Sequence, residues 1–191
     1  GEGMQKMGPA SRGKGAVGQM PELVKEAFIA AEDRRFYQHN GVDVVGISRA
    51  VVTNLQSGSV KQGASTITQQ LARVEFLNQD QTLIRKAKEA ALALKLERQL
   101  SKEQILNQYL NNVYLGSSAY GVADAAWIYY SKTVDELTLP QAALIAGLPP
   151  APSAYSPLVN PDLAIQQRNT VLRKMLEAGF ITAAQEQEAK T

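Results

Sequence analysis

The chain has 191 residues, a length typical of one domain and sufficient to bury a hydrophobic core without covalent staples. Its content of 45% hydrophobic and 20% charged residues excludes wholesale disorder, and the absence of cysteine excludes a disulfide scaffold, an iron–sulfur cluster and a thiol nucleophile. A net charge of +2 is too small for a dedicated nucleic-acid-binding protein unless the charges cluster, so we expect no nucleic-acid partner. The single histidine, His39, excludes a His-rich zinc site, so any metal would be a hard cation on oxygen ligands.

Residues 1–20 are rich in glycine and lack the periodicity of a regular element. We expect them to form a flexible lead-in or linker ahead of a single domain over residues 21–191. The chain starts at a glycine, with neither an initiator methionine nor a signal peptide, so we expect a processed chain or a segment of a longer protein. It contains no run of about 18 apolar residues, so we expect no segment of this sequence to span a bilayer.

From residue 21 onward the spacing of apolar residues predicts helices and no strand of useful length, so the sequence predicts an all-α domain. Several helix starts carry a capping box, in which a Ser or Thr precedes a Gln by three positions. The expected helices begin near residues 21, 43, 66, 82, 101, 122, 138, 160 and 182. The helix that begins near residue 101 is expected to end at Gly116. The four prolines within residues 149–157 predict an extended loop.

The first candidate site is the run E-D-R-R-F-x-x-H-x-G that begins at Glu32. Because Val24, Phe28 and Glu32 lie four residues apart, the Glu32 carboxyl group ends an apolar stripe. A carboxyl group held against apolar surface tends to have a raised pKa, which suits a general base or acid. The adjacent acid and the two arginines also fit an ordinary solvated ion-pair cluster. Phe36 is most simply a core residue, and His39 a residue that braces the loop.

The second candidate is the run G-A-S-T-I-T-Q-Q that begins at Gly63. Thr66 and Gln69 form a capping box, which by itself explains these two residues. The run holds more hydroxyl and amide side chains than a cap requires, and such groups at a helix start can bind an anion or a sugar. The glycine permits close approach of a backbone, and Arg73 adds a cation one turn further on.

The third candidate is the run R-K-x-K-E that begins at Arg85. Arg85 and Glu89 are four residues apart and share a helix face, which on its own fits an ordinary exposed ion pair. Together with Arg73, the basic residues Arg85 and Lys86 would suit a diphosphate, whose oxygens an arginine can bind in a fork. Glu89 would orient these basic side chains or bind a Mg²⁺-type ion.

Taken together, these runs resemble the peptidoglycan glycosyltransferase domain of glycosyltransferase family 51. This domain occurs in class A penicillin-binding proteins and in monofunctional transglycosylases. Five segments follow the order of the family, namely the three runs above, L-N-x-V-Y-L-G from Leu110 and A-x-x-A-G-L-P-x-A-P from Ala143. The sequence departs from the family at Val74, where members often have Asn, and at Gln81, where some have a basic residue.

The resemblance implies a lysozyme-like helical fold with a larger head lobe and a smaller, membrane-proximal jaw lobe. It implies that lipid II is polymerised into β-1,4-linked glycan, with inversion at the anomeric carbon and release of undecaprenyl diphosphate. Glu32 would be the catalytic base, and Glu89 the second essential acid near the donor diphosphate. Arg73, Arg85 and Lys86 would surround that diphosphate. The other positions expected to bind substrate are Asp33, Phe36, His39, Gly63, Ser65, Thr66, Gln69 and Gln70.

The resemblance also implies partners and a location. The substrates would be lipid II and the growing lipid-linked glycan, at the outer face of the bacterial cytoplasmic membrane. An N-terminal segment outside this chain would be the anchor, and the parent chain would be monofunctional or would add a transpeptidase domain. A divalent cation (Mg²⁺ or Mn²⁺) is compatible with this chemistry, with Glu89 as the candidate ligand, and no organic cofactor is expected. We further expect residues 42–55 to bind the membrane surface weakly, or else to pack into the core.

Two functions of other classes stay open. A lysozyme-like muramidase would use the same fold and a glutamate at a helix end, but it would have no diphosphate for the basic run at residues 85–89 to bind. A non-catalytic helical adaptor would need no convergence of Glu32, Glu89, Arg73 and Arg85 in one cleft.

Overall fold

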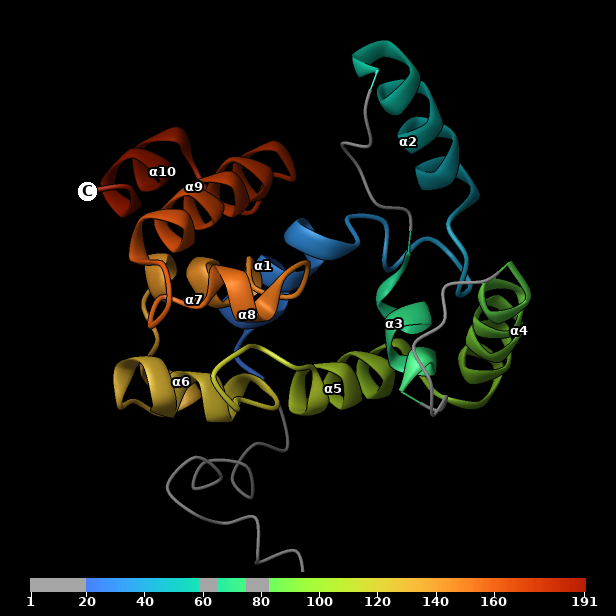
Figure 1. Ribbon diagram of the computed structural model, residues 1–191, viewed down its shortest axis with the longest axis horizontal. Coiled ribbons are helices and arrows are strands. Elements are labelled where there is room, and N and C mark those ends of the chain that lie inside the picture. Colours follow the sequence, from blue (N-terminus) through green and yellow to red (C-terminus); the bar gives the residue numbers. More distant parts are fainter. Residues whose placement is uncertain (1–19, 59–64, 75–82) are drawn as a thin grey trace, which may run out of the picture. The chain divides into compact units, whose positions relative to one another are not determined.

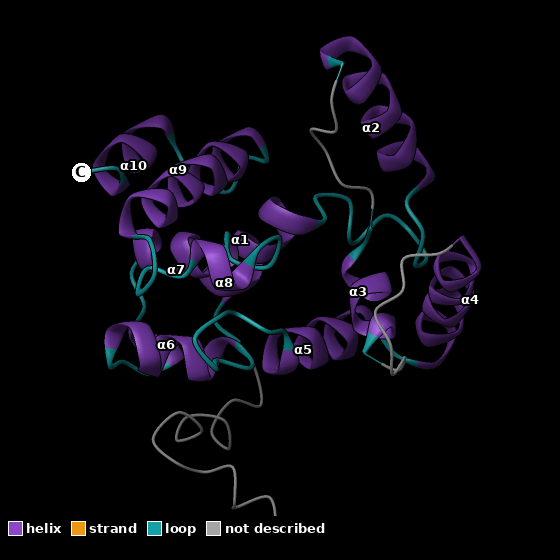
Figure 2. Cartoon of the chain, viewed as in Figure 1, coloured by secondary structure: helices purple, strands orange, loops and turns teal. Residues whose placement is uncertain are grey.

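The computed structural model describes residues 20–58, 65–74 and 83–191, and the regular elements in these ranges are helices (Figure 1, Figure 2). Within them, extended backbone pairs only at an isolated antiparallel bridge between Tyr114 and Tyr120. The prediction of an all-α fold is therefore confirmed. The elements are α1 (Glu22–Glu32), α2 (Val44–Ser57), α3 (Ile67–Arg73), α4 (Leu83–Gln99), α5 (Lys102–Asn112), α6 (Val122–Tyr130), the 3₁₀ helix η4 (Val134–Glu136), α7 (Leu139–Ala146), α8 (Pro152–Tyr155), α9 (Pro161–Glu177) and α10 (Ala183–Ala189).

The chain divides into two compact units. Unit 1, the larger, comprises residues 1–34 and 110–191, and unit 2 comprises residues 35–109. In unit 1, α1, α7 and α9 pack against one another. Phe28 on α1, Ile145 on α7 and Leu172 on α9 are fully buried, and burial of such a side chain typically contributes about 1.5–3 kcal/mol. Packing against α7 and α9 thus fixes the position of α1, whose last residue is Glu32.

Unit 2 contains α2, α3, α4 and most of α5, together with the loop that leads into α2. Helix α3 packs against α4, and Ile67 and Ala93 are fully buried. The loop passes directly over α4 at Gly41, whose φ is +114° and where an added Cβ would lie 2.9 Å from the Ala93 carbonyl oxygen. Only glycine accommodates both the positive φ and this close approach.

Local capping signals fix the helix starts as the sequence predicts. At α5, the Ser101 N–H donates to Gln104 Oε1 (2.8 Å), and the Gln104 N–H donates to Ser101 Oγ (3.1 Å). The same reciprocal pair joins Thr182 and Gln185 at α10. Each cap of this kind typically contributes about 1 kcal/mol. The capping box at α3 also forms, and it belongs to the candidate site.

Asp43 caps α2 and connects the helix to the preceding loop. Its Oδ1 accepts hydrogen bonds from the Gly46 N–H and from Arg35 Nε, each at 3.0 Å. Burial alone would raise the pKa of the Asp43 carboxyl group, but these two hydrogen bonds and the positive charge of Arg35 outweigh it and lower the pKa. The ionised carboxylate therefore fastens the start of α2 to Arg35.

Two sequence-based expectations are wrong in detail. The segment 149–157 is not wholly extended, because α8 forms inside it; its single proline, Pro152, occupies the first helical position, where a missing N–H costs no hydrogen bond. Helix α5 ends at Asn112 and not at Gly116. Beyond Asn112 the chain forms the Tyr114–Tyr120 bridge, and Gly116 (φ +81°) lies in the turn between the bridged residues.

Helix α2 turns its large apolar side chains outward. The only buried residue of the helix is Ala50. At about 100° per residue, the exposed aliphatic side chains lie within roughly 160° of the helix circumference. They are Val44, Val45, Ile47, Val51, Val52 and Leu55. The interpretation of this stripe as core packing is therefore wrong. Among the described residues, no helix has both the length and the apolar character needed to cross a bilayer.

Candidate active site

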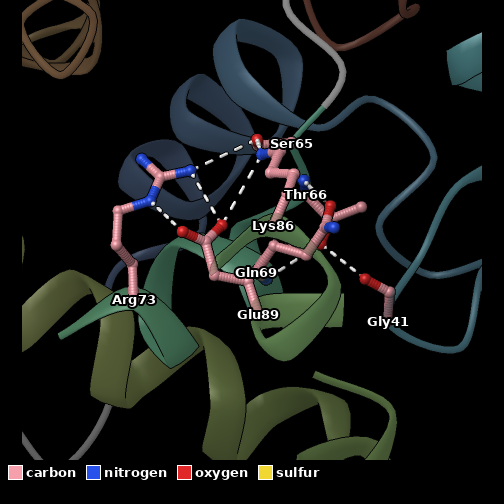
Figure 3. Close-up of polar contacts among 7 residues, drawn as sticks. All are labelled: Gly41, Ser65, Thr66, Gln69, Arg73, Lys86 and Glu89. Carbon is pink, nitrogen blue, oxygen red and sulfur yellow. Dashed lines mark hydrogen bonds and ion pairs between the residues drawn. The ribbon is translucent and has the colours of Figure 1, made fainter. Parts of the chain in front are cut away.

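The start of α3 is built from the predicted capping box. Thr66 Oγ1 accepts a hydrogen bond from the Gln69 N–H (3.0 Å), and Gln69 Oε1 accepts one from the Thr66 N–H (2.9 Å). Thr66 Oγ1 also donates to the Gly41 carbonyl oxygen (2.7 Å), which ties α3 to the loop over α4 (Figure 3). Thr66 and Gln69 are both buried. Their hydrogen bonds thus fix the start of α3 against the loop at Gly41.

A buried ion pair joins α3 to α4. The Glu89 side chain is 0% exposed, and Arg73 binds both of its oxygens, with Nε 3.1 Å from Oε2 and Nη2 3.2 Å from Oε1 (Figure 3). Lys86, one turn before Glu89 on α4, places Nζ 3.5 Å from Oε1. A buried carboxylate is stable only when it is paired and hydrogen-bonded. Arg73 and Lys86 therefore supply the paired positive charge and the hydrogen bonds that the enclosed Glu89 side chain needs inside unit 2.

Ser65 connects the same two cations. Its Oγ accepts hydrogen bonds from Lys86 Nζ (2.5 Å) and from Arg73 Nη2 (3.3 Å) (Figure 3). Two cations and one carboxylate leave one formal positive charge in this cluster of Ser65, Arg73, Lys86 and Glu89, which we call the cation cluster. The side chains of Arg73 and Lys86 are 31% and 45% exposed, whereas Glu89 is enclosed. The cluster therefore presents positive charge outward, with its compensating negative charge behind.

Other predicted site residues of unit 2 lie near these elements. Arg85 is buried, in contrast to its largely exposed neighbour Lys86. Gln70 is half-buried, and its Oε1 accepts a hydrogen bond from the Tyr109 hydroxyl (3.1 Å). Gly63 and Gln81 lie outside the described residues. Val74, one of the departures from the family pattern, is exposed at the end of α3.

The loop after α1 holds two predicted site residues in its core. Phe36 is fully buried beneath the ammonium group of Lys102, which lies 4.4 Å from the ring centroid. The buried His39 ring meets Phe36 edge-on, with centroids 6.1 Å apart, and its Nδ1 accepts a hydrogen bond from the Gly41 N–H (3.0 Å). Phe36 is thus a core residue and His39 braces the loop, as the simpler interpretation of the sequence predicted.

Glu32 and Asp33 belong to unit 1. Glu32 is the last residue of α1 and is half-buried, beyond the fully or nearly fully buried Val24 and Phe28 of the same stripe. Asp33 is buried, and its N–H donates to the Ile29 carbonyl oxygen (3.0 Å) at the end of the helix. The end of α1 thus carries one buried acidic residue, Asp33, and one that is partly accessible, Glu32.

The donors around Glu89 do not fit a divalent cation. Both carboxylate oxygens already bind Arg73, and the nearest other groups are a lysine and a serine. Mg²⁺ and Mn²⁺ bind through oxygen ligands, typically one or two carboxylates together with waters or substrate phosphates, and the two cationic side chains on Glu89 would repel such an ion. Across the described residues, no group of three His, Asp or Glu side chains could hold a metal ion. We therefore assign Glu89 to the two cations and derive no step through a metal.

Comparisons with known proteins identify the family of the chain. A family model described as Transglycosylase matches residues 2–176. Penicillin-binding protein 1A of Escherichia coli (strain K12) is 56% identical over 171 residues, which cover 90% of this chain and 20% of that protein. The proteins of the same name from Neisseria lactamica and Aquifex aeolicus (strain VF5) are 54% and 52% identical, each over 91% of this chain and over 22% and 24% of their own lengths. The chain thus spans about a fifth to a quarter of these relatives.

A solved structure of a protein with the same name as these relatives also matches the chain. The crystal structure of penicillin-binding protein 1A from Haemophilus influenzae aligns with 92% of this chain and 16% of that one, with a TM-score of 0.51 and 26% sequence identity. Its helical fold agrees with the predicted lysozyme-like, all-α class. The family match extends over most of the sequence, and the relatives exceed half identity over nine-tenths of it. The chain therefore belongs to the transglycosylase family, the peptidoglycan glycosyltransferases of glycosyltransferase family 51.

Proposed function

We propose that this chain polymerises lipid II into β-1,4-linked glycan strands, inverting the anomeric carbon and releasing undecaprenyl diphosphate. The observation that supports the donor chemistry is the cation cluster. In it, the partly exposed cations Arg73 and Lys86 pair with the fully buried Glu89. A diphosphate leaving group needs neutralisation of its developing charge and no proton, so two fixed cations suit it. The substrate of a glycan-cleaving muramidase contains no diphosphate for these cations to bind. The cation cluster therefore favours the transferase.

In this proposal Glu32 is the catalytic base. Its carboxylate takes the proton of the acceptor 4-hydroxyl group as that oxygen attacks the anomeric carbon of the donor. The bond from the anomeric carbon to the diphosphate oxygen breaks at the same time, and its electron pair leaves with the diphosphate. The half-buried position of Glu32 at the end of a buried apolar stripe supports this role, because partial desolvation makes a carboxylate a better base.

Glu89 acts in this proposal as a positioning residue. Since it is fully enclosed, it touches no substrate, and it holds Arg73 and Lys86 at a fixed separation. Ser65 and Gln70, which keep part of their surface, are proposed substrate contacts. Five of the other buried members of the predicted set are proposed to fix the loop after α1 and the start of α3. They are Asp33, Phe36, His39, Thr66 and Gln69.

The test is incubation of the chain with lipid II, followed by sizing of the glycan products, with and without a chelator of divalent cations. Polymer formation with release of undecaprenyl diphosphate is the expected result, and the chelator arm measures the metal dependence separately. Cleavage of preformed glycan without polymerisation would replace this proposal with the muramidase. If neither polymerisation nor cleavage occurs, the non-catalytic helical adaptor would be the favoured function.

We also propose that α2 lies on the outer face of the bacterial cytoplasmic membrane, where lipid II is found. Six exposed aliphatic side chains on one helix face match an interfacial helix. Val51→Asp is expected to lower binding to lipid vesicles roughly tenfold, because it removes one aliphatic anchor and adds a charge to be dehydrated. Co-sedimentation with vesicles measures this effect.

A matched control is Val159→Asp, which changes an exposed valine of unit 1. Val159 is 66% exposed and Val51 is 51% exposed, so the two substitutions alter a similar surface. The control is expected to bind vesicles like the wild type. Equal losses in the two variants would show that the aspartate acts through overall charge and would remove α2 from the membrane contact.

A further inference from the structure

The positive charge of the chain is concentrated in one unit. Unit 2 carries ten Lys and Arg residues against six Asp and Glu, a net charge of +4, whereas unit 1 carries ten against twelve, a net charge of −2. The modest net charge of the whole chain hides this separation. A local excess of positive charge attracts acidic partners, and the net charge of the whole chain does not reveal it.

The excess is most exposed on α4. Both carboxylates of this helix point inward, since the Glu89 and Glu97 side chains are 0% and 7% exposed. Glu97 is held inside by Thr68 Oγ1 and by Lys102 Nζ, each at 2.8 Å from its Oε2. The charged residues left on the outer surface of α4 are therefore all basic.

Three of these basic residues lie outside the cation cluster. Lys88, Lys95 and Arg98 are exposed, and none of their side chains forms an ion pair or hydrogen bond with a described residue. In unit 1, by contrast, every described Lys and Arg has a carboxylate or another acceptor oxygen as partner. Within the part of the chain that the structure describes, no acidic side chain neutralises these three cations of α4.

Aliphatic side chains accompany this row. Leu83, Ile84 and Leu94 are exposed on the same helix. At about 100° per residue, they and the three cations fall within roughly 140° of the circumference of α4. A helix face that combines aliphatic side chains with unpaired cations and lacks exposed acids is typical of a helix that lies on an anionic lipid surface.

We propose that this outer face of α4 binds the headgroups of anionic phospholipids, and that it gives unit 2 a second, charge-dependent membrane contact. The inference rests on the proposed membrane association through α2 and adds lipid selectivity to it. Lys88, Lys95 and Arg98 donate to lipid phosphates, while Leu83, Ile84 and Leu94 enter the boundary of the acyl chains. The contact holds unit 2 at the surface on which a lipid-linked donor is presented.

The test compares binding of the chain to phosphatidylcholine vesicles with binding to vesicles that also contain phosphatidylglycerol. Each basic residue near an anionic surface contributes about fivefold, so the three together give a preference on the order of 100-fold for the anionic vesicles. The triple variant Lys88→Gln, Lys95→Gln, Arg98→Gln is expected to lose that preference and to keep wild-type binding to phosphatidylcholine alone. The charge-conserving variant Lys88→Arg, Lys95→Arg, Arg98→Lys is expected to retain it.

Each outcome decides between the two proposals. If the wild type binds neither kind of vesicle, the membrane association through α2 fails, and this inference fails with it. If phosphatidylcholine binding is intact but the wild type shows no anionic preference, or the triple Gln variant keeps one, only the role of α4 is overturned. Raising the salt from ~0.05 M to ~0.5 M should abolish the preference in the wild type, because the contact is electrostatic. A thermal melt of each variant checks that the exposed substitutions leave the fold intact.

Discussion

Glu32→Gln is expected to abolish polymerisation of lipid II while leaving the fold unchanged. The amide keeps the size of the side chain at the end of α1 but accepts no proton at neutral pH. A positioned general base typically contributes about 10²–10⁴-fold to the rate. We therefore expect turnover to fall by roughly that factor, measured as undecaprenyl diphosphate released per unit time. The core of unit 1 behind Glu32, built on Val24 and Phe28, is untouched, so the melting temperature should not change.

A matched control lies on the same helix. Glu26 is also half-buried, and burial, together with the nearby Glu22, raises the pKa of its carboxyl group. It lies almost two turns away from the end of α1, and Glu26→Gln is expected to polymerise at the wild-type rate. Wild-type activity in Glu32→Gln would remove Glu32 from the role of base. Equal losses in both variants would show that the effect comes from the charge of α1 and not from a proton transfer at one position.

The sequence predicts most of the helices because their starts are local. The capping boxes at Thr66, Ser101 and Thr182 involve side chains three residues apart, and each forms as expected. The errors arise where a local signal is ambiguous. Gly116 adopts the left-handed conformation that often ends a helix, but it does so within a turn after α5 has already ended. Pro152 starts a short helix where a cluster of prolines predicted none.

Periodicity alone leaves open what an apolar stripe faces. Val44, Ile47, Val51 and Leu55 have the spacing of a helix face, and the same spacing would serve a buried helix. Only the packing of α2, which rests on Ala50, shows that the stripe is exposed. The sequence therefore predicts the face, and the tertiary structure decides between core and membrane.

The partners in the cation cluster could not be paired from the sequence. The spacing of Arg85 and Glu89 also fitted an ordinary exposed i,i+4 pair, but both residues are buried. The fork on Glu89 comes instead from Arg73, sixteen residues away on α3, because α3 packs against α4. A contact between helices depends on how they dock, which no local pattern encodes. The sequence therefore predicted which residues form the site, but not which side chains pair with one another.

Arg73→Met is expected to destabilise unit 2 by about 3 kcal/mol, because it leaves the enclosed Glu89 carboxylate without its main partner. The estimate lies at the low end of the usual range because Lys86 stays 3.5 Å away. Denaturant unfolding followed by circular dichroism measures the loss. Arg34→Met is a control, since it breaks the ion pair with Glu177, in which the two side chains are 43% and 53% exposed, and surface pairs contribute less than about 1 kcal/mol.

The double variant Arg73→Met, Glu89→Leu separates the structural role of this pair from its functional role. Replacing both partners by apolar side chains removes the uncompensated charge, so most of the lost stability should return. Donor binding should not return, because the diphosphate has lost its forked cation, and the KM for lipid II should rise together with a fall in kcat. A double variant that is stable and polymerises at the wild-type rate would confine Arg73 to holding α3 on α4. A double variant that is no more stable than Arg73→Met would show that the buried charge is not what the arginine compensates.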